Sequence, residues 1–135
     1  MINRLSRRRF GQNYLTDKSV IYQIVDKINP GIEDDFIEIG PGQGAITKSI
    51  KNNSRNLTLI EIDRENVAYL KSSLGNEIKI FEEDILKIDL SFIKNNDRVI
   101  GNLPYNIASQ IIIRFLELNK KIFDMHFMVQ KKWPK

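Results

Sequence analysis

Four consecutive residues, Asn102, Leu103, Pro104 and Tyr105, carry groups suited to the chemistry of an aromatic amine. Asn102 and Leu103 offer a side-chain and a backbone carbonyl oxygen, Pro104 has a fixed φ that holds a turn, and Tyr105 offers a ring for stacking a planar base. Two acceptors on the N–H groups of an adenine would favour the pyramidal nitrogen that can attack a sulfonium methyl group. Such catalysis is mostly positioning and electrostatics. A plain turn is the structural alternative, since Asn and Pro favour turns.

A ligand-binding loop is indicated by Gly40, Gly42 and Gly44, which directly follow the apolar run at residues 36–39. Glycine allows a sharp turn and a close approach of the backbone to a ligand. The spacing G-x-G-x-G is one residue shorter than the dinucleotide fingerprint, so it favours a nucleoside without phosphates. A tight turn with no ligand is the alternative.

Two acidic residues follow the next predicted strands. Glu61 lies 21 residues beyond Gly40, close to the roughly 20-residue offset at which an acid meets ribose hydroxyls in nucleotide-binding sheets. Asp84 could accept a hydrogen bond from an exocyclic amino group, and the backbone N–H of Ile85 could reach a ring nitrogen. The alternative for both acids is an ordinary surface carboxylate.

The apolar periodicity supplies the elements that must position these residues. It predicts helices at residues 18–28, 45–51, 64–74 and 108–119, and strands at residues 36–39, 56–63, 78–81, 98–101 and 125–129. Strands that alternate with helices require a parallel sheet covered on both faces, so the expected fold class is α/β, doubly wound. Ligands of such sheets bind beyond the carboxyl ends of the strands, where the strand order reverses. We therefore expect the glycines, both acids and residues 102–105 to meet there.

Composition and charge restrict the cell compartment and the partners. The 135 residues suit one domain, and the absence of cysteine excludes disulfides and thiolate metal sites. We find no apolar run of membrane-spanning length and no signal peptide, so we expect a cytoplasmic protein with no membrane partner and no metal. Residues 1–13 contain no acid and four basic residues, Arg4, Arg7, Arg8 and Arg9. This arm is predicted to contact phosphates, with a solvated terminus as the alternative.

Six segments, in order, resemble the successive motifs of one family, the rRNA adenine N6,N6-dimethyltransferases of the KsgA type. The segments are FGQNYL, EIGPGQGAIT, LIEIDRE, EEDILKID, GNLPYNIAS and MHFMVQK. The resemblance runs from about Arg9 to Lys131. It implies a Rossmann-like methyltransferase sheet that binds S-adenosylmethionine.

The resemblance also assigns a role to each matching position. Gln12, Asn13 and Leu15 would lie near the methionine end of S-adenosylmethionine. The cofactor loop would be Gly40, Gly42 and Gly44, and Glu61 with Ile62 would hold the ribose. Asp84 and Ile85 would hold the adenine of the cofactor, and the stretch from Asn102 to Tyr105 would hold the target adenine, with Asn102 also touching the cofactor.

The family's target is implied as well: two adjacent adenines in a loop near the 3′ end of small-subunit rRNA, within the immature 30S particle. Such bases are already unpaired or are flipped at low cost. The resemblance therefore implies that the basic arm contacts RNA phosphates. The related Erm-type enzymes, which methylate large-subunit rRNA, tend to have Ile where Leu103 stands and to lack Pro41, so both residues favour the small-subunit type.

The sequence departs from the family after the MVQK motif. Members continue with a further helix, two strands and a small helical RNA-binding domain, whereas here residues 131–135 form an atypical tail. We therefore expect a basic arm at residues 1–13, a partial methyltransferase domain at residues 14–130 with a sheet incomplete after the fifth strand, and no helical domain. An active enzyme and an inactive fragment both stay open. The strand edge at residues 127–129 is expected to promote self-association.

Three other functions are considered. A non-catalytic rRNA-binding or ribosome-assembly factor would keep the site but act by docking, and an Erm-type enzyme would act on large-subunit rRNA. A DNA adenine methyltransferase shares the amine chemistry but usually has Pro where Leu103 stands. The single histidine, His126, is interpreted as structural, because no second ligand or nucleophile accompanies it.

Overall fold

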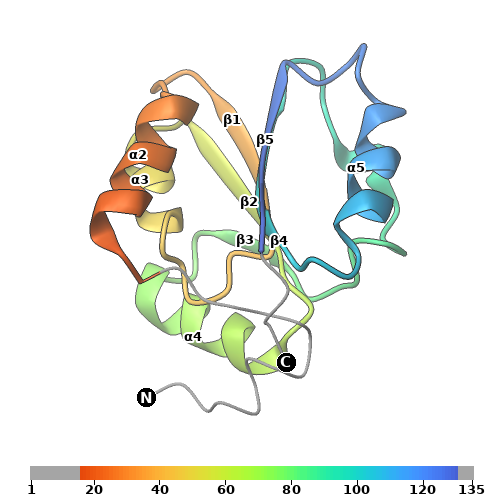
Figure 1. Cartoon of the computed structure of the whole chain (residues 1–135). Helices are drawn as coiled ribbons and strands as arrows, with labels where there is room; N and C mark the ends of the chain where they lie inside the picture. Colours follow the sequence, from red (N-terminus) through yellow and green to blue (C-terminus); the bar gives the residue numbers. More distant parts are fainter. Residues whose placement is uncertain (1–15, 131–135) are drawn as a thin grey trace.

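The computed structural model describes residues 16–130, which fold around one five-stranded sheet (Figure 1). The strands are β1 (Asp35–Ile39), β2 (Asn56–Ile60), β3 (Lys79–Phe81), β4 (Arg98–Leu103) and β5 (Asp124–Val129). The helices are α2 (Lys18–Ile28), α3 (Thr47–Asn52), α4 (Arg64–Leu74) and α5 (Ala108–Leu116), with a 3₁₀ turn η1 at Leu90–Phe92.

The sheet is parallel throughout and has the strand order β3-β2-β1-β4-β5. The helices lie on both sides of it, with α2 and α3 on the left and α5 on the right in Figure 1. The predicted class, a doubly wound α/β sheet, is confirmed. The strand order reverses between β1 and β4, because β2 and β3 lie on one side of β1 and β4 and β5 on the other.

Two helices have the predicted bounds because their ends carry specific signals. Asp17 begins α2, since its carboxylate accepts the N–H groups of Ser19 and Val20. Asp63 begins α4 in the same way, through the N–H groups of Glu65 and Asn66. Gly75 ends α4 at a φ of 87°, a conformation that favours glycine.

Several predicted bounds are wrong by a few residues. The first helix after the glycines begins at Thr47, not Ala45, because the turn takes up the residues between. Strand β2 ends at Ile60, so Glu61 follows it instead of lying within it. Strand β4 continues to Leu103, since Asn102 and Leu103 pair with Met128 and Val129 of β5. The predicted helix 108–119 ends at Leu116, and the 3₁₀ turn was not predicted.

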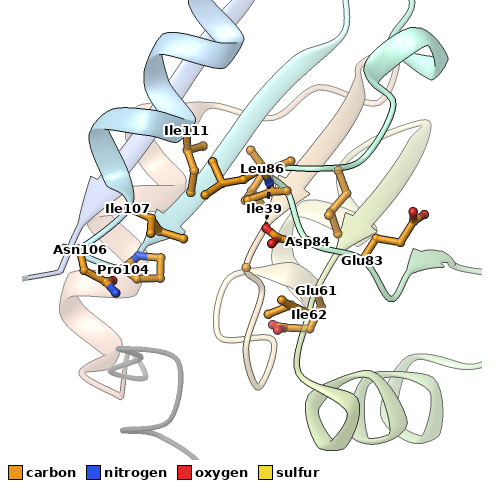
Figure 2. A pocket seen from close by; sticks show the side chains of 13 residues that line it. Ile39, Glu61, Ile62, Glu83, Asp84, Leu86, Pro104, Asn106, Ile107 and Ile111 are labelled. Atoms are coloured by element: carbon orange, nitrogen blue, oxygen red, sulfur yellow. Dashed lines mark hydrogen bonds between the residues drawn. The ribbon is translucent and has the colours of Figure 1, made fainter.

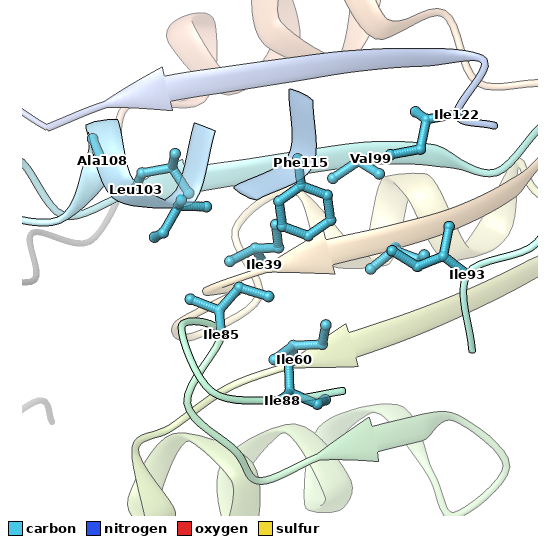
Figure 3. Close-up of a cluster of buried hydrophobic side chains, with 12 residues drawn as sticks. Ile39, Ile60, Ile85, Ile88, Ile93, Val99, Leu103, Ala108, Phe115 and Ile122 are labelled. Atoms are coloured by element: carbon cyan, nitrogen blue, oxygen red, sulfur yellow. The ribbon is translucent and has the colours of Figure 1, made fainter. Parts of the chain in front are cut away.

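Each face of the sheet carries its own apolar core. Alternation along β1 sends Ile37 and Ile39 to the α5 side and Phe36 to the side of α2 and α3. The core on the α5 side also contains Phe115 and the residues that Figure 3 draws around it, from β2, β4 and the segment between β3 and β4. These two cores fix the carboxyl ends of β1, β2 and β4 relative to one another.

A buried ionic cluster lies at the opposite, amino-terminal end of β4. The guanidinium of Arg98, a residue only 7% exposed, donates to both carboxylate oxygens of Asp124, at 2.8 and 2.9 Å, and to Asp34 at 2.8 Å. It also donates to the carbonyls of Ile28 and Asn29 at the end of α2. This cluster therefore links the carboxyl end of α2 and the residue before β1 to the amino-terminal ends of β4 and β5. His126 lies beside it, with Nε2 3.0 Å from Asp124.

No helix within residues 16–130 has the length and apolar character needed to span a membrane. The same residues contain no group of three or more His, Cys, Asp or Glu side chains arranged to hold a metal ion.

Candidate active site

A cavity of about 270 Å³ opens at the carboxyl edge of the sheet, where the strand order reverses (Figure 2). Five elements contribute to it: the ends of β1 and β2, the turn after β3, the turn after β4 and the first half of α5. The lining residues are Ile39, Gly40, Ile60, Glu61, Ile62, Glu83, Asp84, Ile85, Leu86, Pro104, Asn106, Ile107 and Ile111. Gly40, Glu61 and Asp84, which were predicted as site residues and lie far apart in the sequence, thus line one cavity. It lies at the edge where parallel sheets bind ligands.

The glycine loop needs glycine for a physical reason at each of the three positions. Gly40, Gly42 and Gly44 have φ values of 63°, 60° and 83°, in the left-handed region that side chains disfavour. At Gly40 there is also a close approach, because a Cβ atom would lie 3.3 Å from the backbone oxygen of Asn102. The loop after β1 and the motif at the end of β4 are therefore in direct contact.

The Glu61 carboxylate holds this loop in place. Its Oε1 atom accepts the N–H of Gly42 and its Oε2 atom accepts the N–H of Asp63, both at 2.9 Å. Glu61 is 1% exposed, and its burial raises the pKa of the carboxyl group, although the two backbone N–H groups act in the opposite direction. The side chain of Asn66 also hydrogen-bonds to this carboxylate, and a carboxylate has about four acceptor sites in all. Glu61 can therefore support the loop and bind a ligand hydroxyl.

Asp84 points into the cavity from the turn that follows β3 (Figure 2). Its Oδ1 atom accepts the N–H of Leu86 at 2.9 Å, which closes a tight turn and orients the carboxylate. The backbone oxygen of Asp84 accepts the N–H groups of Lys87 and Ile88, both at 2.9 Å. This turn presents a carboxylate beside apolar side chains, which suits an amino group on a flat aromatic ring.

The four residues of the amine motif lie in different environments. Pro104 lines the cavity, whereas Asn102, Leu103 and Tyr105 do not line it among the residues described. Leu103 is fully buried in the core, and its carbonyl accepts the N–H of Gln130 at 3.0 Å. Asn102 is half-buried in the last part of β4, and the Tyr105 ring is 42% exposed. Within this motif the Tyr105 ring is therefore the group most open to solvent, whereas the Leu103 carbonyl is buried and already bonded.

Of the other predicted site residues, Gln12, Asn13 and Leu15 lie outside the described residues, as do Arg4, Arg7, Arg8 and Arg9. Ile62 lines the cavity with 43% of its surface exposed, and Ile85 lines it from a largely buried position. Gly42 and Gly44 do not line the cavity. Their contribution is the shape of the loop.

Sequence reasoning missed Glu38, which lies beneath the glycine loop. Its Oε1 atom accepts the hydroxyl of Thr47 at 2.8 Å, and both residues are buried. Burial raises the pKa of Glu38 to about 8, with a further contribution from the nearby charge of Glu61, while the Thr47 hydroxyl lowers it. The signal was present in the sequence, since a carboxylate in an apolar strand needs a partner when it is buried.

Asn106, Ile107 and Ile111 were also missed, because nothing in the sequence separates cavity-lining residues of α5 and the turn before it from core residues. The charged residues of the lining are Glu61, Glu83 and Asp84, and no lysine or arginine lines the cavity among the described residues. A cavity of this charge disfavours a phosphate group and favours a cationic or neutral nucleoside.

Fold and site together define the class. The sheet order and the glycine loop are those of Rossmann-like methyltransferases. The family model described as "Ribosomal RNA adenine dimethylase" matches residues 3–135. The chain belongs to this ribosomal RNA adenine dimethylase family, and the resemblance seen in the sequence is confirmed.

Individual relatives agree with this family. The chain is 39% identical over 129 residues to a ribosomal RNA small subunit methyltransferase A of Methylobacillus flagellatus, covering 95% of this chain and 51% of that protein. It matches the structure of the 23S rRNA methyltransferase ErmE with a TM-score of 0.71 and 27% identity, covering 82% of this chain and 45% of ErmE. A dimethyladenosine transferase from Plasmodium falciparum shares the fold, with a TM-score of 0.75 and 22% identity over 88% of this chain and 44% of that one. The chain spans about half the length of the curated relatives it matches.

Proposed function

We propose that this chain contains the S-adenosylmethionine site of an enzyme that methylates N6 of adenines in small-subunit rRNA. The observation that carries the proposal is the cavity at the sheet reversal, which combines Glu61, Asp84 and an apolar lining and has no basic residue among those described. Under this proposal, residues 14–130 form the cofactor-binding domain. The relatives named small subunit methyltransferases support the choice of rRNA over DNA.

The residues present fit S-adenosylmethionine by their chemistry. Glu61 would accept the ribose hydroxyls, and the Asp84 carboxylate with the N–H of Ile85 would recognise the adenine edge. The side chains of Ile39, Ile60 and Ile107 give the ring apolar surface, and the acidic lining suits a sulfonium cation. Gln12, Asn13 and Leu15 are proposed for the methionine end. When bound, the cofactor supplies a methyl group that a weak nucleophile can accept.

The chain's own contribution to the chemistry is to position the target adenine. The Asn102 side-chain carbonyl and the Leu103 backbone carbonyl would accept the two N–H groups of the amine, which favours a pyramidal nitrogen. In the structure the Leu103 carbonyl accepts the N–H of Gln130, so under this proposal it would have to accept the amine as a second donor. Tyr105 would stack on the base, and Pro104 would hold the turn. The proton lost after transfer would pass to water, so no strong base is needed in the site.

The finer assignments concern the partner and the compartment. We propose that the substrate is rRNA of the immature 30S particle, that Arg4, Arg7, Arg8 and Arg9 contact RNA phosphates, and that the protein works in the cytoplasm. The basic, acid-free composition of residues 1–13 supports the RNA contact.

Calorimetry with S-adenosylhomocysteine tests the cofactor site. We expect heat of binding with the 135-residue chain and clearly weaker, still measurable binding by Asp84→Ala. The matched control is Glu82→Ala, an exposed acid two residues away that does not line the cavity. Absence of binding by the unchanged chain would rule out the cofactor site in this chain, and equal binding by Asp84→Ala would rule out the role of Asp84.

The chemistry is tested separately with Asn102→Ala. We expect methyl transfer to a small-subunit rRNA fragment to be abolished while affinity for S-adenosylhomocysteine stays nearly unchanged. Loss of both together would make Asn102 a structural residue. Salt-dependent RNA binding by the unchanged chain without any turnover would favour a docking factor over an enzyme.

The outer edge of β5 supports a proposal of self-association. Strand β5 pairs with β4 on one side and lies at the edge of the sheet, and Val129 at its end is 51% exposed. Unpaired edges are templates for pairing with a second copy. A single monomeric species in sedimentation velocity at high concentration would contradict this proposal.

A further inference from the structure

Arg114 joins the two walls of the cavity. It lies on α5, one turn beyond the cavity-lining Ile111, and its guanidinium reaches across to the turn after β3. Nη1 donates to the backbone oxygen of Ile85 at 2.6 Å, and Nη2 donates to the backbone oxygen of Ile88. Both acceptors belong to the segment 84–88 that carries Asp84. One side chain on α5 therefore holds the turn that presents Asp84 to the cavity.

The geometry matters because the two walls come from separate parts of the chain. One wall is the turn with Asp84, Ile85 and Leu86, and the other is formed by Pro104, Asn106, Ile107 and Ile111. Ile85 and Ile111 belong to the same apolar core, but apolar burial is not directional and does not by itself fix the orientation of the walls. Two charge-assisted hydrogen bonds from one planar fork fix both distance and orientation.

The same helix begins a few residues after the amine motif. Helix α5 starts at Ala108, directly after the turn that follows Asn102 and Leu103. By fixing α5 to the segment 84–88, the Arg114 guanidinium therefore also fixes the amine motif at residues 102–105 relative to the Asp84 turn. Arginine suits this role better than lysine, because its planar fork presents two N–H donors in a fixed geometry, whereas the lysine ammonium is a point charge on a flexible stem.

We propose that Arg114 is a positioning residue, which holds the Asp84 turn in register with α5 and with the motif at residues 102–105. The inference rests on the proposed function, because it gives Arg114 a purpose at that same cavity. Arg114 does not line the cavity and would act through the two backbone carbonyls. The nearby carboxylate of Asp89 accepts the N–H of Ser91, which lowers the pKa of Asp89, and the charge of Arg114 contributes to this lowering.

The test compares Arg114→Met and Arg114→Lys in the full 135-residue chain. We expect S-adenosylhomocysteine to bind at least tenfold more weakly to Arg114→Met and less severely so to Arg114→Lys. The nucleoside 5′-methylthioadenosine should lose affinity by the same factor, because the effect is on the adenine end. The matched control is Arg55→Met, which removes an exposed arginine paired with Asp35 at the other end of the sheet.

A double-mutant cycle separates positioning from general stability. If Arg114 acts through Asp84, Arg114→Met should weaken 5′-methylthioadenosine binding much less in an Asp84→Ala chain than in the unchanged chain. Equal fold-losses in the two backgrounds would overturn the proposal, and so would unchanged affinity in Arg114→Met. An unchanged chain that binds no ligand would instead reject the proposed cofactor site.

Amide hydrogen exchange provides a measurement that needs no ligand. It can be made on Arg114→Lys even if Arg114→Met does not fold. In Arg114→Lys we expect faster exchange at Leu86, Lys87 and Ile88, with protection in the central strands unchanged. Unaltered exchange in this segment would overturn the proposal, because the turn would then hold its position without the fork.

Discussion

The carboxylate of Glu61 connects the end of β2 to the glycine loop, since its Oε1 atom accepts the N–H of Gly42 at 2.9 Å. Its other oxygen accepts the N–H of Asp63 at the start of α4. The residue proposed to bind the ribose is therefore also the residue that shapes the loop. Substitutions at Glu61 should change both properties.

In Glu61→Gln, the amide NH₂ group must face one of two backbone N–H donors, so one of the two hydrogen bonds is lost. We expect affinity for S-adenosylhomocysteine to fall about tenfold or more, equivalent to about 1.4 kcal/mol. Calorimetry measures the change, with Glu77→Gln, an exposed residue remote from the cavity, as the control. Unchanged affinity would show that Glu61 only supports the loop.

Glu38 should make stability depend on pH. Its pKa is raised from 4.5 to about 8 in the folded chain, so between these values the folded state binds more protons than the unfolded state. The free energy of unfolding should therefore fall as pH rises through this window, by at most about 1.4 kcal/mol per pH unit. In Glu38→Gln this contribution disappears, so the variant should gain stability relative to the unchanged chain towards pH 8. Urea denaturation between pH 5 and pH 8.5 measures the difference, and a constant difference would contradict the prediction.

Gly40→Ala should weaken both stability and cofactor binding. The new Cβ would sit at a φ of 63° and 3.3 Å from the Asn102 oxygen, so the loop or the end of β4 must shift. We expect a loss of about 1–2 kcal/mol in the free energy of unfolding. Gly75→Ala is a matched control, because it has a φ of 87° but its Cβ would meet nothing within 4 Å. Equal effects of the two variants on cofactor affinity would argue against the contact between loop and motif.

Arg98→Met should lower the free energy of unfolding without changing the affinity for S-adenosylhomocysteine. It leaves Asp124 and Asp34 without their guanidinium partner and frees two carbonyl groups at the end of α2. The Asp34 and Asp124 side chains are 33% and 30% exposed, so we expect a cost below the about 3–5 kcal/mol that a fully buried pair loses. Urea denaturation measures the loss. Arg55→Met is the comparison: it removes an exposed arginine from the largely buried Asp35 and should cost less, because Asn56 and Lys94 still donate to that carboxylate. Reduced affinity of folded Arg98→Met for S-adenosylhomocysteine would mean that the two ends of the sheet are coupled.

The sequence by itself determined the class of fold and part of the cavity. Alternating strands and helices required a parallel sheet, and Asp17, Asp63 and Gly75 placed two helices at their observed ends because capping is a local interaction. The same topology placed Gly40, Glu61 and Asp84 at one edge, since parallel strands end together.

Only the tertiary structure decided which groups act on one another. That Glu38 binds Thr47, that Gly40 abuts Asn102 and that Arg114 holds the Asp84 turn are contacts between distant residues. The extension of β4 to Leu103 also depends on its pairing with β5. Local propensity carries no information on such contacts, because they follow from how the helices pack on the sheet.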